Sequence, residues 1–145
     1  MKIRTSIAAA GAAVVLGGSA ALALPATAST HAAAHTLKFI SVTAKSAPFT
    51  ARTEGLQDTD VNSAGKTIGF DDVYLTFTGR TTGKGNVAVV LDGGFLYGTL
   101  ATSNAGQTFS GKVTGGTGAF AKAAGKITAK AITSQKTAVT ITYTT

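Results

Sequence analysis

The fold of this chain is decided by the stretch Val113-Thr114-Gly115-Gly116-Thr117-Gly118-Ala119-Phe120-Ala121-Lys122-Ala123-Ala124-Gly125. Three glycines, Gly115, Gly116 and Gly118, fall within four positions around one threonine. Such a run asks for backbone angles that other residues reach only with strain, so it predicts a tight crossover between two strands. We take these glycines and Gly125 as structural turn residues.

Alternating strands lie on both sides of this turn. Apolar and polar residues alternate with a period of two, which places one face of each strand in a core. The predicted strands cover residues 36–44, 73–78, 87–91, 95–101, 109–113, 127–131 and 139–144, with a hairpin turn at 92–94 and a helical turn at 120–124. Seven strands and so little helix indicate an all-β domain. A sheet of this size avoids open edges by closing into a barrel or folding into a sandwich, and periodicity does not choose between them.

The N-terminus has the order of a secretory signal peptide. Lys2 and Arg4 precede an apolar run over residues 7–24, and Pro25 comes just before the small residues Ala26-Thr27-Ala28. Basic, apolar and Ala-x-Ala segments in this order predict cleavage after residue 28. An uncleaved membrane anchor is the alternative, because the run approaches the roughly 20 residues that span a bilayer.

The remaining chain is long enough for one domain. We expect a signal peptide over residues 1–28, a flexible mature N-terminus over 29–35 and a β-barrel domain over 36–145, secreted and without a membrane partner after processing. The sequence has no cysteine, so neither a disulfide nor a thiolate metal site can form. Its formal net charge of +7 includes Lys2 and Arg4, and removing both leaves +5. The other basic residues are scattered singly, which argues against a nucleic-acid partner.

Four pieces of the sequence resemble the dirigent and allene oxide cyclase superfamily of small β-barrels. They occur in the family's order, as Phe70-Asp71-Asp72, Gly79-Arg80-Thr81-Thr82-Gly83, Gly98-Thr99-Leu100 and the glycine-rich stretch that ends at Gly125. The resemblance implies a single closed antiparallel barrel of about eight strands with a cavity, often assembled as a homotrimer. Since only seven strands are evident, we seek the eighth in residues 49–55.

The same resemblance directs attention to Asp72 and Arg80, which match family positions. In the dirigent signature an acid and an arginine commonly stand where this chain has Ala119 and Ala124. Two methyl groups cannot move a proton, so no catalytic residue beyond the candidate Asp72 is assigned. Adjacent strand residues point to opposite faces, so the alternatives for Asp71 and Asp72 are that one of them faces the cavity or that one caps the strand entrance and the other is solvated. The second alternative is favoured.

The ligand-binding candidates are Asp72, Tyr74, Arg80 and Tyr97. The two tyrosines are expected to line the lumen, with the carboxylate and the guanidinium as polar anchors; alternatively, both tyrosines are core aromatics with the hydroxyl at the rim. No cofactor is expected.

Two patterns of metal-ligand type are weighed against simpler readings. The stretch Asp58-Thr59-Asp60-Val61-Asn62-Ser63-Ala64-Gly65 spaces oxygen atoms as a calcium loop does, but Ser63 replaces the required glycine. A polar connection whose side chains bond their own backbone is favoured. His31 and His35 have i, i+4 spacing without a third ligand. No metal site is therefore assigned, and no histidine is expected within the folded region, which excludes a Ser-His-Asp hydrolase.

Three functions remain open. The favoured one is a secreted barrel that binds a small apolar, aromatic or phenolic ligand in its lumen without catalysis. The second is a cyclase or stereo-directing, dirigent-type enzyme that acts in the cavity through Asp72. The third is an envelope structural or interaction protein whose barrel is filled.

Overall fold

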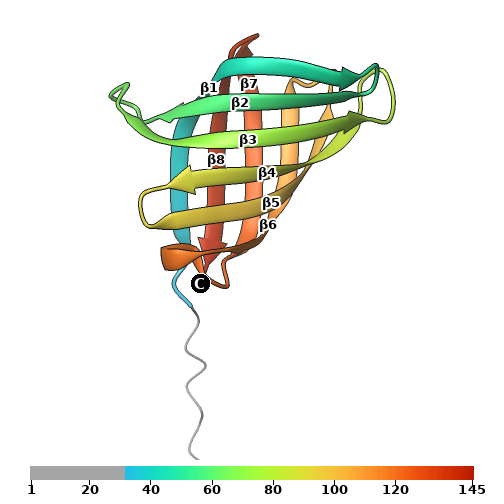
Figure 1. Cartoon of the computed structure of the whole chain (residues 1–145). Coiled ribbons are helices and arrows are strands. Elements are labelled where there is room, and N and C mark those ends of the chain that lie inside the picture. The colour runs from blue at the N-terminus through green and yellow to red at the C-terminus, as the bar shows by residue number, and fades with distance from the viewer. Residues whose placement is uncertain (1–31) are drawn as a thin grey trace, which may run out of the picture. The chain divides into compact units, whose positions relative to one another are not determined.

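The computed structural model describes residues 32–145. Eight strands follow one another along the chain as β1 (His35–Thr50), β2 (Thr53–Val61), β3 (Thr67–Phe77), β4 (Gly83–Leu91), β5 (Gly94–Ser103), β6 (Thr108–Gly116), β7 (Ala124–Thr133) and β8 (Lys136–Thr144). Each strand pairs antiparallel with its neighbours, and β8 pairs with β1 (Figure 1). The expected closed antiparallel barrel is confirmed.

The N-terminal predictions lie largely outside this range. The signal peptide over residues 1–28 and the first residues of the predicted flexible segment 29–35 are outside the described residues. No helix within residues 32–145 is long and apolar enough to cross a membrane. The first strand begins at His35 rather than Thr36, so this histidine belongs to the fold, and its ring stacks on Tyr143 with centroids 5.3 Å apart.

Strand parity fills the barrel with apolar side chains. Val87 of β4 is paired with Val73 of β3 and with Gly98 of β5, and all three face inward. A Cβ at Gly98 would lie 2.5 Å from the Cδ1 atom of Ile127, so the glycine makes room for this side chain of β7. The buried apolar core consists of Phe39, Val87, Val89, Leu96, Leu100, Val113, Phe120, Ala123, Ile127, Ile141 and Tyr143.

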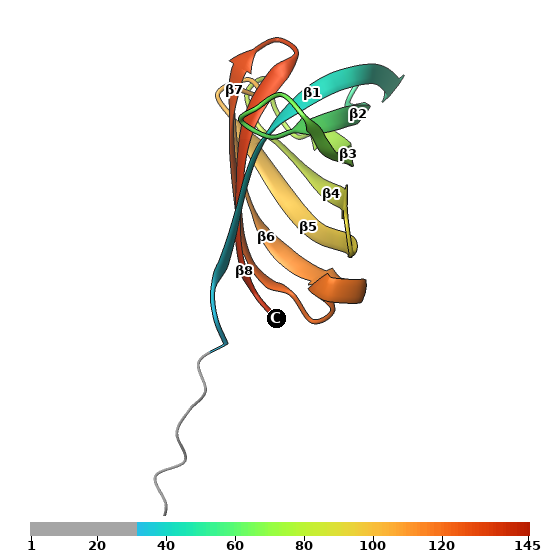
Figure 2. The ribbon, with the colours of Figure 1, turned by 90° about the vertical axis from the view of Figure 1, so that its left-hand side faces the viewer.

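The long strand β1 joins two halves of the barrel. Residues 35–42 pair with β8, and residues 40–50 pair with β2, with a register shift between Thr43 and Lys45. Figure 2 shows β1 rising beside β8 and then bending toward β2. Bulges increase the local bend of a strand. The register shift thus lets β1 pair with β8 along its first half and with β2 along its second half.

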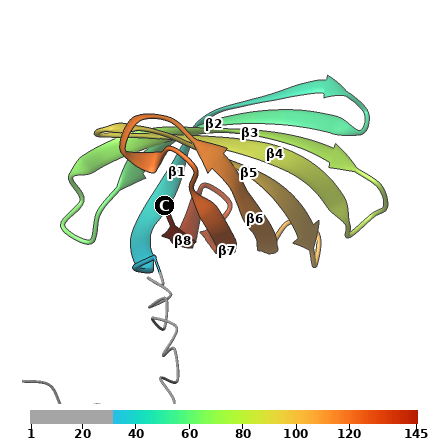
Figure 3. The same ribbon diagram turned by 90° about the horizontal axis from the view of Figure 1, so that it is seen from below.

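The glycine-rich stretch seals one end of the barrel, here called the closed end and formed by the β4–β5 hairpin and a short 3₁₀ helix, η1 (Gly118–Phe120). The amide of Ala119 donates to the carbonyl oxygen of Gly93 at 2.9 Å, and the amide of Thr117 donates to that of Phe95 at 2.9 Å. Both η1 and the C-terminus lie at this end (Figure 3). The predicted turn is therefore present, although its helical part begins two residues before the expected 120–124.

Only one glycine of the predicted turn has a left-handed backbone. Gly118 has φ +58°, whereas Gly115 and Gly116 extend β6. Gly116 is required for a different reason: a Cβ there would lie 2.5 Å from the carbonyl oxygens of both Phe95 and Phe120. Gly125 similarly lies against the backbone of Thr142. Close packing, more than unusual φ angles, explains the glycine density.

The eighth strand overlaps the residues where the sequence analysis sought it only at 53–55. Residues 49–55 contain the turn between β1 and β2, and the missing strand is β2, which ends at Val61. Its sequence, Thr-Glu-Gly-Leu-Gln-Asp-Thr-Asp-Val, lacks the regular apolar alternation of a half-buried strand. Its inward positions carry carboxylates instead, which bears directly on the site.

Candidate functional site: an acidic hollow inside the barrel

Three aspartates point into the barrel from two neighbouring strands. Asp58 and Asp60 are two residues apart on β2 and therefore share a face, and Asp71 of β3 is paired directly with Asp58. Asp58, Asp60 and Asp71 are 8 %, 0 % and 5 % exposed. Such burial is rare for carboxyl groups, which usually remain in water unless they are paired.

One hydrogen bond anchors this acidic cluster. The hydroxyl of Ser41 on β1 donates to Oδ2 of Asp58 at 2.6 Å. The other oxygen of Asp58, both oxygens of Asp60 and Oδ1 of Asp71 are buried without a hydrogen-bond partner among the described residues. An ionised carboxylate without partners is costly to bury, so burial favours the neutral form of Asp60 and Asp71.

The pKa values of two aspartates follow from this environment. Burial, and then the neighbouring Asp71 side chain, raise the pKa of Asp60 to about 9. Burial likewise raises the pKa of Asp71 to about 6. At neutral pH Asp60 therefore keeps its proton, while Asp71 titrates close to neutrality. Two carboxyl groups whose pKa values differ in this way can take separate roles, one as an acid and the other as a base.

The cluster borders a small internal cavity. This cavity has a volume of about 50 Å³, and its polar lining is Ser41, Asp58, Asp71 and Thr137. The other lining residues are Phe39, Leu56, Val73, Val87, Val89, Leu100, Phe109, Ile127, Ala129, Val139 and Ile141. A few convergent polar groups in an apolar cavity are typical of small-molecule sites.

A larger hollow opens at the end of the barrel opposite η1. This open end includes residues 105–107 before β6 and residues 132–134 at the end of β7, and its hollow has a volume of about 590 Å³. The small cavity and the large hollow share four lining residues, Leu56, Asp58, Phe109 and Thr137. Asp58 thus lies where the open hollow meets the deep cavity, and Asp71 lies beyond it.

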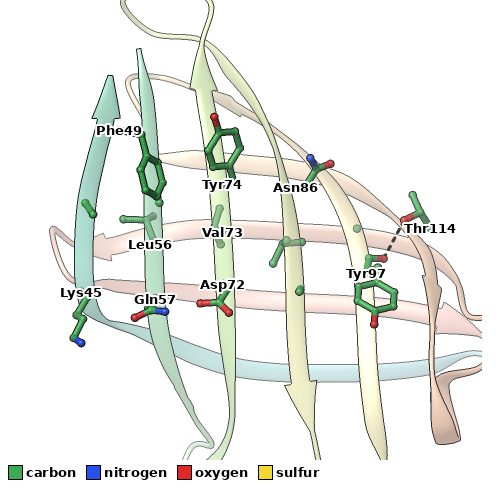
Figure 4. A pocket seen from close by; sticks show the side chains of 15 residues that line it. Lys45, Phe49, Leu56, Gln57, Asp72, Val73, Tyr74, Asn86, Tyr97 and Thr114 are labelled. Atoms are coloured by element: carbon green, nitrogen blue, oxygen red, sulfur yellow. Dashed lines mark hydrogen bonds between the residues drawn. The ribbon is translucent and has the colours of Figure 1, made fainter. Parts of the chain in front are cut away.

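The residues selected from sequence lie elsewhere. Asp72, Tyr74 and Tyr97 are on the outer face of the sheet, and Arg80 is exposed in the loop between β3 and β4. The expectation that the two tyrosines line the lumen is therefore wrong, because their neighbours Val73 and Leu96 occupy the inward positions. These three outer residues border a groove of about 680 Å³ (Figure 4), and their role in binding a ligand stays a prediction.

The adjacent residues Asp71 and Asp72 lie on opposite faces of β3. One of Asp71 and Asp72 does face the cavity, as strand alternation requires, and it is Asp71. The expectation that placed Asp72 inside as the candidate acid is wrong for the same reason.

The calcium-like stretch divides into two parts. Asp58 and Asp60 belong to β2, which corrects the expected polar connection. Asn62 does form a turn: its Oδ1 accepts hydrogen bonds from the amides of Ala64 and Lys66, both at 3.0 Å. Among residues 32–145 no group of three or more His, Asp or Glu side chains is placed to hold a metal ion.

Comparison with known proteins places the fold. No protein-family model matches the chain, and no curated protein matches it. Solved structures do: the chain shares its eight-strand barrel fold with a dirigent protein and with a demethylase, which confirms the expected fold. A pyocyanin demethylase superposes with a TM-score of 0.66 at 20 % identity, covering 76 % of this chain and 100 % of its own. A pterocarpan synthase dirigent protein superposes with a TM-score of 0.65 at 16 % identity, covering 77 % and 88 %.

The sequence analysis missed Ser41, Asp58, Asp60 and Asp71 as a group. The alternation Leu56-x-Asp58-x-Asp60 is a period-two pattern that could have placed both aspartates on the face of Leu56. Strand patterns are usually read from apolar residues, and here the inward residues change from apolar to acidic within one strand.

Proposed function

We propose that the barrel binds a small, largely apolar or aromatic ligand at its open end, with a ligand oxygen against Asp58 and Asp71. The proposal rests on one observation: the open hollow of about 590 Å³ meets the deeper cavity at Asp58, and Asp71 lines that cavity. Its volume lies within the roughly 300–1,000 Å³ range of small-molecule sites. The deeper cavity of about 50 Å³ admits only the tip of a ligand.

Apolar walls and buried carboxyl groups select for a neutral ligand. Leu75, Phe77 and Phe109 supply apolar surface around the open hollow, and removing such surface from water favours binding. A protonated carboxyl donates to a ligand carbonyl or ether oxygen, and an ionised one accepts from a phenolic hydroxyl. An anionic ligand would be repelled by Asp71 above about pH 6, where this carboxyl group is ionised. Phenols and other neutral oxygenated aromatics therefore fit best.

Acid–base catalysis is the second candidate function, and the pKa of Asp71 favours it. A group with a pKa of about 6 exchanges a proton readily near neutral pH. Asp71 would donate its proton to a ligand oxygen and recover it from solvent or from a carbon of the same ligand, as an isomerisation or cyclisation requires. Both solved neighbours carry the names of enzymes or synthases, which is compatible with chemistry in this fold. This differs from a cyclase acting through Asp72, which lies outside the barrel.

Location and assembly are part of the same proposal. A secreted protein would meet its ligand outside the cell, and the basic, apolar and Ala-x-Ala order of residues 1–28 supports this. N-terminal sequencing of protein from culture medium should return Ser29. A homotrimer is tested by light scattering of the purified protein.

Adjacent aspartates on opposite faces provide a matched pair of variants for the binding test. The probe is the neutral fluorophore N-phenyl-1-naphthylamine, displaced by coniferyl alcohol between pH 5 and pH 8. We expect the affinity for coniferyl alcohol to change with an inflection near pH 6, where Asp71 titrates. Asp71→Asn should abolish this inflection, and Asp72→Asn should leave it intact.

A third variant tests the route of entry. Gln107 is exposed at the open end, so Gln107→Trp should obstruct the hollow without disturbing the core and weaken binding of the probe at least tenfold. Unchanged affinity in this variant, or a pH profile that responds to Asp72→Asn and not to Asp71→Asn, would contradict the proposal. Catalysis is measured in two separate assays: enantiomeric excess in the coupling of coniferyl alcohol radicals, and stereoselective ring closure of a fatty-acid epoxide. If Asp71 is the acid, Asp71→Asn should abolish the activity in either assay. Ligand binding without turnover would support the binding function and contradict acid–base catalysis.

A further inference from the structure

A second hollow lies on the outer face of the barrel and is lined by aromatic rings. Phe49 of β1, Tyr74 of β3 and Tyr97 of β5 border a groove of about 680 Å³ (Figure 4). These side chains are 63 %, 45 % and 41 % exposed. Aromatic rings on a protein surface cost solvation free energy unless a ligand or a partner covers them.

Cross-strand pairing explains why this face is hollowed. Tyr74 is paired with Gly55 on one side and with Asn86 on the other. The ring of Phe49 lies over Gly55, where a Cβ would approach its Cε2 atom to 2.7 Å, and the Phe49 and Tyr74 ring centroids are 5.9 Å apart. A glycine below the ring thus lets the phenylalanine lie close to the sheet.

The adjacent row adds hydrogen-bonding groups. Asp72 is paired with Gln57 of β2 and with Ala88 of β4, and Ala88 is paired in turn with Tyr97. Because the side chain of Ala88 is small, it leaves open space between the side chains of Asp72 and Tyr97. One carboxylate and two side-chain amides, those of Gln57 and Asn86, therefore lie beside the aromatic rings.

These polar groups do not satisfy one another. Among the residues drawn in Figure 4, the hydrogen bond runs from Oγ1 of Thr114 to the backbone oxygen of Tyr97, at 3.3 Å, and none joins Gln57, Asp72 or Asn86. Their donors and acceptors are thus available to a ligand.

We propose that this outer groove binds a neutral oligosaccharide. A sugar ring has an apolar C–H face, which packs on an aromatic ring, and an edge of hydroxyl groups, which require donors and acceptors at fixed spacing. Tyr74 and Tyr97 supply the rings, and Asp72 and Asn86 supply partners for the hydroxyls. The groove volume suits a short oligosaccharide.

The charges of the groove argue against anionic ligands. Lys45 and Asp72 are its charged lining residues and carry opposite signs. A nucleic acid or an acidic polysaccharide would meet one cation and one carboxylate, far from the clustered basic residues that phosphate backbones select. A purely apolar partner would leave the polar groups of Gln57, Asp72 and Asn86 without hydrogen bonds.

Titration calorimetry with neutral hexasaccharides tests the proposal. The probes are cellohexaose, xylohexaose, maltohexaose and N-acetylchitohexaose, each added to the whole secreted chain. We expect saturable binding of at least one probe, weakened at least tenfold by Tyr74→Ala and by Tyr97→Ala. Thr128→Ala, on the outer face of β7 and away from the groove, is the matched control and should bind like the unchanged protein.

Further measurements separate this inference from its competitors. Circular dichroism melting checks that each variant is folded, and Tyr74→Phe retains the ring if the alanine variant is not. Failure of all four probes, or binding that neither tyrosine variant weakens, would overturn the proposal. Oligomers that Tyr97→Ala converts to monomers, without sugar binding, would instead identify the face as an interface between copies. Asp71→Asn should leave sugar binding unchanged, so the proposal for the lumen and the proposal for the outer groove are tested independently.

Discussion

The two ends of this barrel are built on opposite principles. At the closed end η1 is bonded to the β4–β5 hairpin, and Phe120 packs edge-on against Tyr143 with ring centroids 5.7 Å apart. At the open end the loops surround a hollow of about 590 Å³, which is lined by Asp58, and Oδ1 of Asp58 is buried without a hydrogen-bond partner among the described residues. Satisfied, close-packed groups stabilise a fold, whereas unsatisfied buried groups destabilise it and are typical of functional sites. The closed end therefore carries stability, and the open end carries the candidate chemistry.

The largest effect should come from the closed end. Gly118→Val places a β-branched side chain at φ +58° and against the backbone of Gly93, so we expect a loss of about 3 kcal/mol or more in the free energy of unfolding. Gly115→Val is the matched control, because no atom lies within 4 Å of its Cβ position. Urea unfolding measures both. Equal midpoints for the two variants would remove the distinction between a required and a tolerant glycine.

A pair of phenylalanines compares the two ends directly. Phe120 is 7 % exposed in the packed closed end, and Phe120→Ala should cost about 3–5 kcal/mol through lost burial and the cavity left behind. Phe109 borders the open hollow and is only partly buried, so Phe109→Ala should cost clearly less. Thermal melting of both variants tests the order. The reverse order would place the stability of the barrel at its open end.

The buried carboxyl groups should make the protein less stable as the pH rises. Folding raises the pKa of Asp60 to about 9 and of Asp71 to about 6, from an ordinary value of 3.8. Between about pH 4 and pH 9 the folded chain then holds more protons than the unfolded chain, so stability falls with increasing pH. Asp60→Asn should reduce this fall, because the amide is neutral without taking up a proton, and should gain about 1 kcal/mol or more at pH 8, the scale of a pKa shift of one unit. Melting temperatures from pH 5 to pH 8 measure the slope, and an identical slope in the variant would refute the assignment.

The smallest effect should be a gain. Thr102 of β5 is 4 % exposed, and its hydroxyl has no hydrogen-bond partner among the described residues. Thr102→Val keeps the shape and removes the unsatisfied group, so we expect a gain of up to about 1 kcal/mol. Chemical denaturation at two pH values is sufficient to detect it. A loss of stability would mean that the hydroxyl has a partner, such as a bound water.

Most of the fold could be predicted from local patterns. The strands from β3 to β8 alternate apolar and polar residues clearly enough to be read, and the Asp92-Gly93-Gly94 hairpin and the crossover at Gly118 are set by backbone geometry. The strand β2 could not be read in this way, because its inward residues are Leu56, Asp58 and Asp60. Its carboxyl groups resemble a solvated loop until the neighbouring strands are in place.

The candidate site was predictable only in part. Strand alternation allowed one of Asp71 and Asp72 to face inward, but it does not say which, because a shift of one residue exchanges the two faces. The favoured alternative, a strand cap and a solvated carboxylate, is wrong because Asp71 is buried against the cavity. Val73 and Leu75 could have decided the question, since they share parity with Asp71. The partnership of Ser41 with Asp58 joins residues on separate strands and depends on the register of β1 and β2, which no local pattern specifies.

The pairing of β8 with β1 has a consequence for the order of the chain. Apart from the pair β1 and β8, each strand pairs only with its sequence neighbours, and His35 is paired with Tyr143, so the first and last strands are joined by the same antiparallel pairing as the others. The barrel is a ring in which the position of the chain break is arbitrary. A circular permutant that joins Thr145 to residue 34 through a short linker, with new ends in the exposed turn at Ser134, should form the same barrel with an unbroken seam.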